Sequence, residues 1–519
     1  MTAAAPGAAP RPFRLGFRNV MAVVFIMIGA TMQSIDTTIA NVALPHMQGS
    51  LAATLDQIAW VLTSYIVASA VGTPLVGWLA ARMGQKKVLL ASLAGFTATS
   101  LLCGIAATLE QMVLFRALQG LSSAALLPLA QAVMMRIYPR EYFAKAMAII
   151  GVGMMLGPIL GPTLGGYITE MANWRWVFLV NLPLGIISFV GVWLFLDEYQ
   201  SSTDTYFDIF GFAMLTLGIA SFQLMLDRGE TKQWFESVEI QLYAGLAALA
   251  FYMFVVQMVT ARKPFVSRAL FLDRNFITGS LLFVVTSCNM FITVALQPPM
   301  LQNVMGYPAL IVGFVLAPRG VGTMLGMILS ARLMNRIDVR WIVIAGLGLA
   351  ALGLWDMSRL STDISQWDIV RSASVQGLGL GLVFVQLNTI AFASLPRHLH
   401  VEAATMFNLV RAMGTSAGLS IGVALLSQYT QINHAELSQF ISPYYESWRL
   451  AGMPEAFASL SDPRSLEILN REVTRQSMMI SFVNSFHWLM LSALAAILLM
   501  LFVRIPRAMT PNPAAHAEV

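Results

Sequence analysis

The chain is a succession of long apolar segments separated by short polar ones. A transmembrane helix needs about 20 mainly apolar residues, and fourteen segments of the 519-residue sequence meet this requirement. They lie near residues 20–44, 57–80, 88–108, 111–134, 143–168, 176–196, 207–226, 239–259, 275–299, 309–331, 341–358, 369–393, 401–428 and 478–503. The pattern predicts an all-α integral membrane protein with 14 transmembrane helices and both termini on one side.

Composition and charge support this interpretation. Only 11% of the residues are charged and 57% are hydrophobic, whereas soluble domains carry about 25% charged residues. With the N-terminus inside, most of the 31 Lys and Arg residues fall in predicted cytoplasmic segments, as expected for a multi-pass protein of the cell inner membrane. The basic residues form no continuous face, so no nucleic-acid partner is expected.

The order of the segments predicts two halves. The stretch "LDEYQSSTDTYFDIF" (196–210) is acidic and contains no Lys or Arg, which suits a linker between them. "GWLAARMGQKK" (77–87) and "GMILSARLMNR" (326–336) form a faint internal repeat, a common feature of secondary transporters. We therefore predict a cytoplasmic tail (1–19), a six-helix bundle (20–196), the linker with two inserted transmembrane helices (197–274), a second six-helix bundle (275–503) including an outside loop (429–476), and a cytoplasmic tail (504–519).

One acidic residue lies deep in the first apolar segment, within "MQSIDTTIANVALP" (32–45). Asp36 has no Lys or Arg within ten positions on either side, and a charge at the centre of a membrane helix costs about 2.5–3.5 kcal/mol. Arg116 is a basic residue inside the fourth span. We predict that Asp36 binds and releases a transported proton and that Arg116 controls this exchange. The alternative is a static ion pair that braces the first and fourth helices.

Four stretches, taken in order, resemble the signatures of one family. They are "DTTIANVALP" (36–45), "GWLAARMGQKK" (77–87), "FRALQGLSSAALLPL" (115–129) and "GPILGPTLGG" (157–166). Over nearly its whole length the chain resembles the major facilitator superfamily, in its branch of fourteen-helix drug:proton antiporters (EmrB/QacA type). The resemblance implies the major facilitator fold, with two six-helix bundles plus two inserted helices. It also implies transport driven by the proton gradient, without a cofactor.

The cytoplasmic loop motif departs from the family pattern at one position. Ala81 stands where the superfamily commonly has an acidic residue, which puts the usual charge lock at this helix end in doubt. Arg82, Lys86 and Lys87 are predicted to hold lipid headgroups or helix ends. The motif as a whole comprises Gly77, Arg82, Gly84, Lys86 and Lys87.

A Gly/Pro-rich segment follows in the fifth span. With Gly153, its glycines recur about every four residues and share one helix face, which permits close helix packing. The resemblance favours a hinge and seal between the halves, and the alternative is close packing alone. This antiporter motif comprises Gly157, Pro158, Gly161, Pro162, Gly165 and Gly166.

Other polar side chains within the spans are candidates for lining a substrate cavity. They are Gln33, Asn41, Gln119, Asn289, Gln297, Asn388 and Arg411. Gln119 is equally well explained as a polar tie between helices. Asp36 is the acid deep within the spans, and it stands against up to three arginines, Arg116, Arg319 and Arg411. Because exporters of cations need acids to compensate the charge of the ligand, we expect a cargo that is neutral or weakly acidic.

These features predict a proton-driven antiporter that exports hydrophobic drugs or toxic small molecules. The resemblance implies a tripartite system with an EmrA-type periplasmic adaptor and an outer-membrane TolC-like channel. The stretch "SDPRSLEILNREVTRQ" (461–476) has helix-like spacing and predicts a folded cap in the outside loop, which is either an adaptor site or a lid. Export of an endogenous metabolite, siderophore or fatty acid by the same cycle is the alternative. The sequence lacks a nucleophile–base motif, HExxH, clustered metal ligands and GxxxxGK[ST], so neither an enzyme nor ATP or metal dependence is expected.

Overall fold

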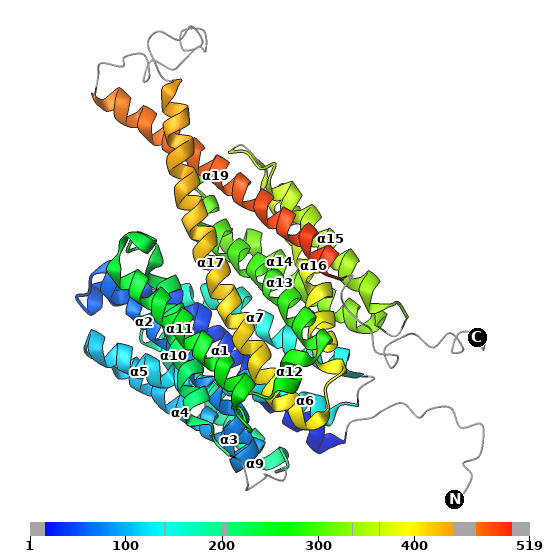
Figure 1. Ribbon diagram of the computed structural model, residues 1–519. Helices are drawn as coiled ribbons and strands as arrows, with labels where there is room; N and C mark the ends of the chain where they lie inside the picture. The colour runs from blue at the N-terminus through cyan, green and yellow to red at the C-terminus, as the bar shows by residue number, and fades with distance from the viewer. Residues whose placement is uncertain are drawn as a thin grey trace, which may run out of the picture.

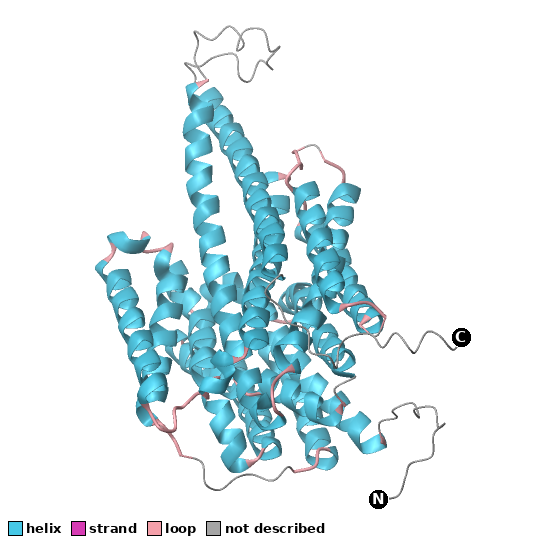
Figure 2. Ribbon diagram, turned by 45° about the vertical axis from the view of Figure 1, so that its right-hand side comes forward, coloured by secondary structure: helices cyan, strands magenta, loops and turns pink. Residues whose placement is uncertain are grey.

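The computed structural model describes residues 16–139, 142–198, 206–334, 336–362, 364–440 and 463–500, and these residues are helical, without a strand (Figure 2). Thirteen of the described helices are long and apolar enough to cross a membrane, and a bent pair makes up to 14. The predicted all-α membrane fold is confirmed.

The first group of helices contains the predicted signature motifs. α1 packs against α7 and α9, α4 against α5 and α9, and α2 against α5. α2 and α3 form the bent pair, with an angle of 53° at Thr73–Pro74. The elements are α1 (Phe17–Ser50), α2 (Leu55–Gly72), α3 (Leu75–Met83), α4 (Gln85–Ile105), α5 (Leu109–Ser123), α6 (Leu126–Ile137), α7 (Phe143–Met171), α8 (Trp176–Leu179) and α9 (Asn181–Phe195).

The second group follows an inserted helix pair. The pair is α10 (Ile209–Gly229) and α11 (Val238–Thr260), and α10 packs on both α2 and α17, so it touches both groups (Figure 1). Within the second group, α16 packs against α13, α14 and α15, and α19 against α15 and α17. Its elements are α12 (Arg268–Leu272), α13 (Arg274–Pro299), α14 (Ala309–Leu333), α15 (Val339–Met357), α16 (Gln366–Ala393), α17 (His400–Gln439) and α19 (Pro463–Leu499).

We call the face at which α1 begins and α3 ends the inner face, and the opposite one the outer face. The two groups meet through α7 with α14 and α16, and through α17 with α3 and α6. At the inner face, Gly77 of α3 lies against the first turn of α17, where a Cβ on this glycine would come within 3.7 Å of the Glu402 Cα.

The loop motif makes the turn between α3 and α4. Gly84 has a φ of 91°, a conformation that glycine adopts without the steric cost that other residues bear. Arg82 lies over the Trp78 ring at 5.1 Å, while Lys86 is half-buried and Lys87 is exposed. These positions leave the three basic side chains at the end of the bundle, where lipid headgroups would lie.

α17 and α19 extend further at the outer face than the other helices (Figures 1 and 2). The helix-like spacing in 461–476 is confirmed from Pro463 onward, but this segment continues the last membrane helix rather than forming a separate cap. His434 Nε2 and Asn470 Oδ1 are 3.0 Å apart, which joins the two helices near their outer ends. Residues 441–462 of the predicted outside loop, the C-terminal tail and residues 1–15 lie outside the described residues.

Candidate functional site

Asp36 and Arg116 meet in the interior of the first helix group. Asp36 is on α1 and Arg116 is on α5, and both side chains have no exposed surface. The Arg116 Nη1 donates to Asp36 Oδ2 at 2.8 Å. The sequence therefore identified two residues that the fold brings into direct contact, although 80 positions separate them.

Neutral side chains complete the coordination of the Asp36 carboxylate. Gln119 Nε2 donates to Oδ1 at 3.2 Å, and Asn181 Nδ2 donates to the same oxygen at 2.7 Å. The Asn181 amide also donates to Ser100 Oγ at 3.0 Å. Helices α1, α4, α5 and α9 thus each contribute one polar group or more to a single buried network.

Arg116 is held by more than the ion pair. Its Nη1 also donates to Gln119 Oε1 at 2.8 Å, and its Nε donates to the Val61 carbonyl of α2 at 3.2 Å. The Tyr65 ring lies 4.3 Å from its guanidinium carbon, within the range of a cation–π contact. The Nη2 atom is buried and has no hydrogen-bond partner among the described residues.

This arrangement suits reversible proton binding. A carboxylate in a dry interior is stabilised by its neighbouring guanidinium and by the amide donors. The exchange of a proton at Asp36 stays a prediction.

Asn181, Ser100 and Tyr65 are missing from the sequence-based site. Asn181 offered a signal, because it is a lone amide in the apolar run "FLVNLPLG" (178–185). Ser100 and Tyr65 offered none, since such residues occur throughout membrane helices and only the packing of α4 and α2 brings these two to the network.

The predicted cavity residues do not form one site. Gln119 belongs to the Asp36 network, Asn289 Nδ2 donates to Ser492 Oγ on α19 at 2.9 Å, and Gln297 Nε2 lies 3.3 Å from Met357 Sδ. Gln33 is half-buried and Asn41 is exposed on α1. Asn289 and Gln297 thus contact neighbouring helices inside the second group.

Asn388 lies instead in an amide cluster that joins the two groups. Asn408 Nδ2 of α17 donates to Gln131 Oε1 of α6 at 2.6 Å, and Gln131 Nε2 donates to Asn388 Oδ1 of α16 at 3.5 Å. All three side chains are buried. We call Gln131, Asn388 and Asn408 the amide bridge, and it holds α6 against α16 and α17.

Within the membrane helices of the second group, Arg319 and Arg411 are buried or half-buried and have no acidic partner among the described residues. Arg319 is 7% exposed, and its Nε and Nη2 have no hydrogen-bond partner within the described ranges. Arg411 is half-buried and its Nε is likewise unpaired there. Neither takes part in an ion pair with a described residue. Asp36 and Asp208 are the buried acids among the described residues, and of these two only Asp36 is paired with an arginine.

The glycine stripe of α7 packs on α1, within the first group. A Cβ on Gly157 would meet the Ser34 carbonyl oxygen at 2.4 Å, and one on Gly161 would meet Thr38 Oγ1 at 2.1 Å. Thr38 Oγ1 also donates to the Gly157 carbonyl at 2.9 Å. Gly153 and Gly165 face α1 as well, whereas Gly166 faces open space. The side chain of Pro162 lies outside the described residues, and Pro158 is half-buried. The hinge function of this motif stays a prediction.

Adding one methyl group to the stripe tests this packing. We expect Gly157→Ala to lower the melting temperature of the purified protein, because overpacking costs about 1–3 kcal/mol. Gly166→Ala on the same helix should be neutral or slightly stabilising, since its Cβ meets no atom within 4 Å and alanine favours helix. Equal melting temperatures for the two variants would contradict the close α1–α7 contact.

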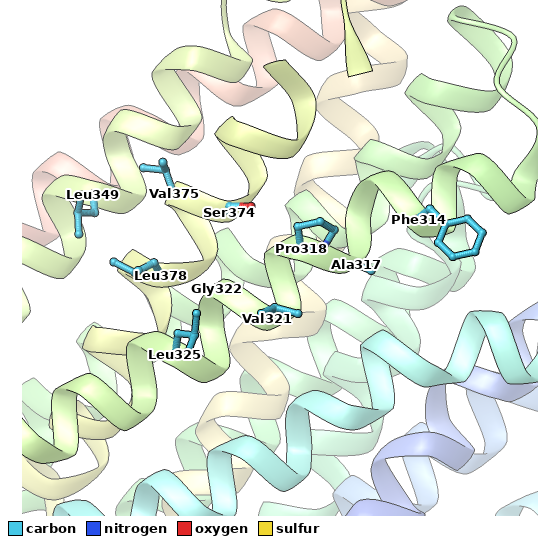
Figure 3. A pocket seen from close by; sticks show the side chains of 10 residues that line it. All are labelled: Phe314, Ala317, Pro318, Val321, Gly322, Leu325, Leu349, Ser374, Val375 and Leu378. Atoms are coloured by element: carbon cyan, nitrogen blue, oxygen red, sulfur yellow. The ribbon is translucent and has the colours of Figure 1, made fainter. Parts of the chain in front are cut away.

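An apolar groove of about 520 Å³ lies elsewhere, on the surface of the second group between α14, α15 and α16 (Figure 3). Phe314 at its edge is 71% exposed, and Ser374 is its one polar lining residue beside Pro318, Val321 and Leu378. None of the predicted cavity residues lines it. An apolar surface of this kind suits contact with lipid acyl chains.

Comparison with known proteins places this arrangement in a family. The family model of the Major Facilitator Superfamily matches residues 26–419. The chain is 34% identical to the fatty acid resistance protein FarB of Neisseria gonorrhoeae, over 86% of this chain and 89% of that protein. It is 31% identical to the multidrug export protein EmrB of Escherichia coli strain K12, over 91% and 93%.

A solved structure has a similar fold. The crystal structure of the human organic anion transporter MFSD10 (TETRAN) matches with a TM-score of 0.58, covering 92% of this chain and 99% of that one. The sequence identity is 12%, so this likeness concerns the fold alone.

Proposed function

The chain belongs to the Major Facilitator Superfamily, and from this premise we propose that it is a proton-driven antiporter that exports hydrophobic, neutral or weakly acidic small molecules. The observation that carries the proposal is the buried Asp36–Arg116 pair with its amide donors. Intramembrane acids are expensive and mark proton pathways in transporters. The relatives named for multidrug export and fatty acid resistance support efflux of small molecules.

The membrane potential supplies enough energy for this cycle. One charge that crosses 100 mV is worth about 2.3 kcal/mol. Exchange of one proton for one neutral molecule at about 150 mV therefore supports a concentration ratio of roughly a few hundred. An anionic cargo moves two charges per cycle and gains about twice the electrical drive.

The charge balance of the interior favours this range of cargo. Arg319 and Arg411 have nitrogen atoms without a hydrogen-bond partner among the described residues, and the buried acid Asp36 is already paired with Arg116. A dication would find no compensating carboxylate beside either arginine, whereas a carboxylate or phenolate would. Export of an endogenous fatty acid by the same cycle is the second candidate, and the relative named for fatty acid resistance favours it.

We further propose that the inner face is cytoplasmic and that the membrane is the cell inner membrane. We also propose that the α17–α19 hairpin binds a periplasmic adaptor of the EmrA type, which leads to a TolC-like channel. The support is the enrichment of Lys and Arg at the inner face and the extension of this hairpin beyond the other helices (Figure 1). A lid over the outer side is the competing role of the hairpin.

Shortening the hairpin separates these two roles. Because His434 and Asn470 are hydrogen-bonded across it, residues 435–469 can be replaced by a short Gly-rich turn. We expect this variant to lose co-purification with a co-expressed adaptor of the EmrA type while it keeps transport in inner-membrane vesicles. Loss of vesicle transport with retained adaptor binding would instead support the lid.

The central experiment is uptake into inverted membrane vesicles with an imposed proton gradient. The protein should drive accumulation of a lipophilic weak acid or a neutral drug, and an ionophore that dissipates the proton gradient should stop it. Accumulation that requires ATP, or that persists without a proton gradient, would overturn the proposal.

A further inference from the structure

Two neighbouring polar groups on α17 lack partners. The Arg411 Nε and the Thr415 Oγ1, one helical turn later, are both buried without a hydrogen bond among the described residues. Threonines elsewhere on this helix behave differently, since Thr405 donates to the Val401 carbonyl at 2.8 Å and Thr430 donates to the Leu426 carbonyl at 2.7 Å. Such bonds to the preceding turn are the usual way to satisfy a hydroxyl in a membrane helix. Thr415 is an exception to this pattern.

The two groups face the first helix group. Residues three and four apart share one side of a helix, so Asn408, Arg411 and Thr415 form one stripe. Asn408 reaches across to Gln131 of α6. The stripe therefore points toward the interface between the halves, and Arg411 and Thr415 come one and two turns from the amide bridge toward the outer face.

The other sides of α17 are occupied at this level. Cys288 Sγ of α13 donates to the Gly414 carbonyl at 2.9 Å. On another side, Gln223 Nε2 of α10 donates to Ser416 Oγ at 2.8 Å. Packing against α13 and α10 fixes the rotation of the helix, and the stripe with the unpaired groups is left facing the other half.

A guanidinium whose buried Nε lacks a hydrogen-bond partner and a hydroxyl that lacks one, both among the described residues, have a common chemical preference. Both donate hydrogen bonds, and a guanidinium in a poorly hydrated place gains most from an anion with two oxygen atoms. Burying such donors without acceptors costs free energy. A carboxylate that accepts hydrogen bonds from both groups would offset this loss. An ammonium ligand would be repelled by the positive charge of Arg411 and would find only the Thr415 hydroxyl oxygen as an acceptor.

We propose that Arg411 and Thr415 form the site that recognises the carboxylate of a lipophilic acid during transport. This inference rests on the proposed function and names the residues that select acidic cargo. The hydrocarbon part of such a ligand would lie along the interface between the halves. Because the site adjoins the amide bridge through Asn408, a bound carboxylate sits next to a contact that must break when the halves separate.

Binding of a matched pair of probes tests the proposal. The full-length protein in lipid nanodiscs is titrated with laurate, a carboxylate, and with methyl laurate, its neutral ester, with empty nanodiscs as the blank. For Arg411→Gln we expect laurate affinity to fall at least about tenfold, the size expected for loss of a charge-assisted pair, while ester affinity stays within about twofold. For Arg411→Lys, which keeps the charge without the planar fork, we expect an intermediate affinity.

Thr415→Val should weaken laurate binding by about two- to tenfold, as expected for one hydrogen bond. Thr430→Val, which removes a hydroxyl already bonded to its own helix, should leave laurate binding unchanged. If Arg411→Gln does not fold, as judged by its melting temperature, then Arg411→Lys and Thr415→Val decide the question. Equal loss of laurate and ester affinity, or no loss in any variant, would overturn the proposal.

The outcome is separable from that of the proposed function. A wild-type protein that accumulates neutral drugs by proton exchange but binds laurate no better than its ester would refute the carboxylate site alone. A wild-type protein that binds laurate through Arg411 but shows no proton-driven accumulation would refute the antiport proposal alone.

Discussion

Replacing Asp36 by Asn is expected to abolish proton-driven accumulation of substrate while substrate binding persists. Asparagine matches the shape of the aspartate side chain but cannot exchange a proton. In inverted vesicles with an imposed proton gradient, the ratio of the substrate concentration inside the vesicles to that outside should therefore fall toward unity. For the wild type this ratio can reach roughly a few hundred. The measurement is uptake with matched amounts of wild-type and variant protein in the membrane.

A second measurement separates lost coupling from lost folding. Counterflow, the exchange of labelled for unlabelled substrate across the membrane without a gradient, needs conformational cycling but no net proton movement. Asp36→Asn should retain counterflow, and so should its matched control Asp356→Asn, which removes a carboxylate paired with Arg371 near the end of α15. The control should also keep proton-driven uptake. Gradient-driven uptake that survives in Asp36→Asn at normal protein levels would remove Asp36 from the mechanism.

The sequence predicts the fold well because lipid imposes a simple requirement. A span must be long, apolar and helical, so the apolar runs locate the helices within a few residues. The outer ends of α17 and α19 are the clearest difference. The polar run from Arg464 to Gln476 has the helical spacing that the sequence predicts, but it is not a separate cap, because it continues a helix that the membrane-embedded part has already nucleated.

The site is predictable only in part, for a related reason. Asp36 and Arg116 can be identified from the sequence alone, because a charged residue in an apolar segment costs free energy whatever its neighbours in the fold are. The amide partners of Asp36 depend on which helix faces pack together, which the sequence does not show. A neutral Asn or Gln in a membrane helix costs too little free energy to mark a functional site. The glycine spacing of α7 shows the same limit. It predicts one small-residue face, but the neighbour of that face is α1 of the same group, which periodicity alone does not reveal.

The two sites lie in different halves of the molecule. The Asp36 network belongs to α1, α4, α5 and α9, whereas Arg411 and Thr415 belong to α17, and the amide bridge between α6 and α17 joins the halves. An antiporter requires that proton binding and substrate binding favour different arrangements of the two halves. In the proposed cycle, sites in opposite halves provide this coupling without direct contact between proton and cargo, because each ligand biases the same interface.

Replacing Arg116 by Gln is expected to have a large effect on stability, and Asp36→Asn, which removes the other partner of the same buried pair, is expected to lower stability for the same reason. Arg116 is the cation paired with Asp36, and neither side chain is exposed. Removing one partner of a buried ion pair leaves an uncompensated charge and costs about 3–5 kcal/mol. Glutamine also cannot reproduce the bond to the Val61 carbonyl together with the contact to Tyr65. We expect a sharply lower melting temperature and less folded protein by size-exclusion chromatography.

Two further variants show whether this loss arises from the buried charge. Arg371→Gln removes an arginine that is 53% exposed and paired with Asp356 at 3.2 Å, and a surface pair of this kind contributes about 0–1 kcal/mol. Its melting temperature should stay close to that of the wild type.

The double variant Asp36→Asn, Arg116→Gln removes both charges, and we expect it to regain much of the stability lost in Arg116→Gln, although not proton-driven uptake. A double variant no more stable than Arg116→Gln would mean that Arg116 acts through packing against Tyr65 and Val61 rather than through its charge. Recovery of stability without recovery of coupled uptake would show that the membrane interior tolerates these helices without an ion pair, and that the pair is kept for the proton.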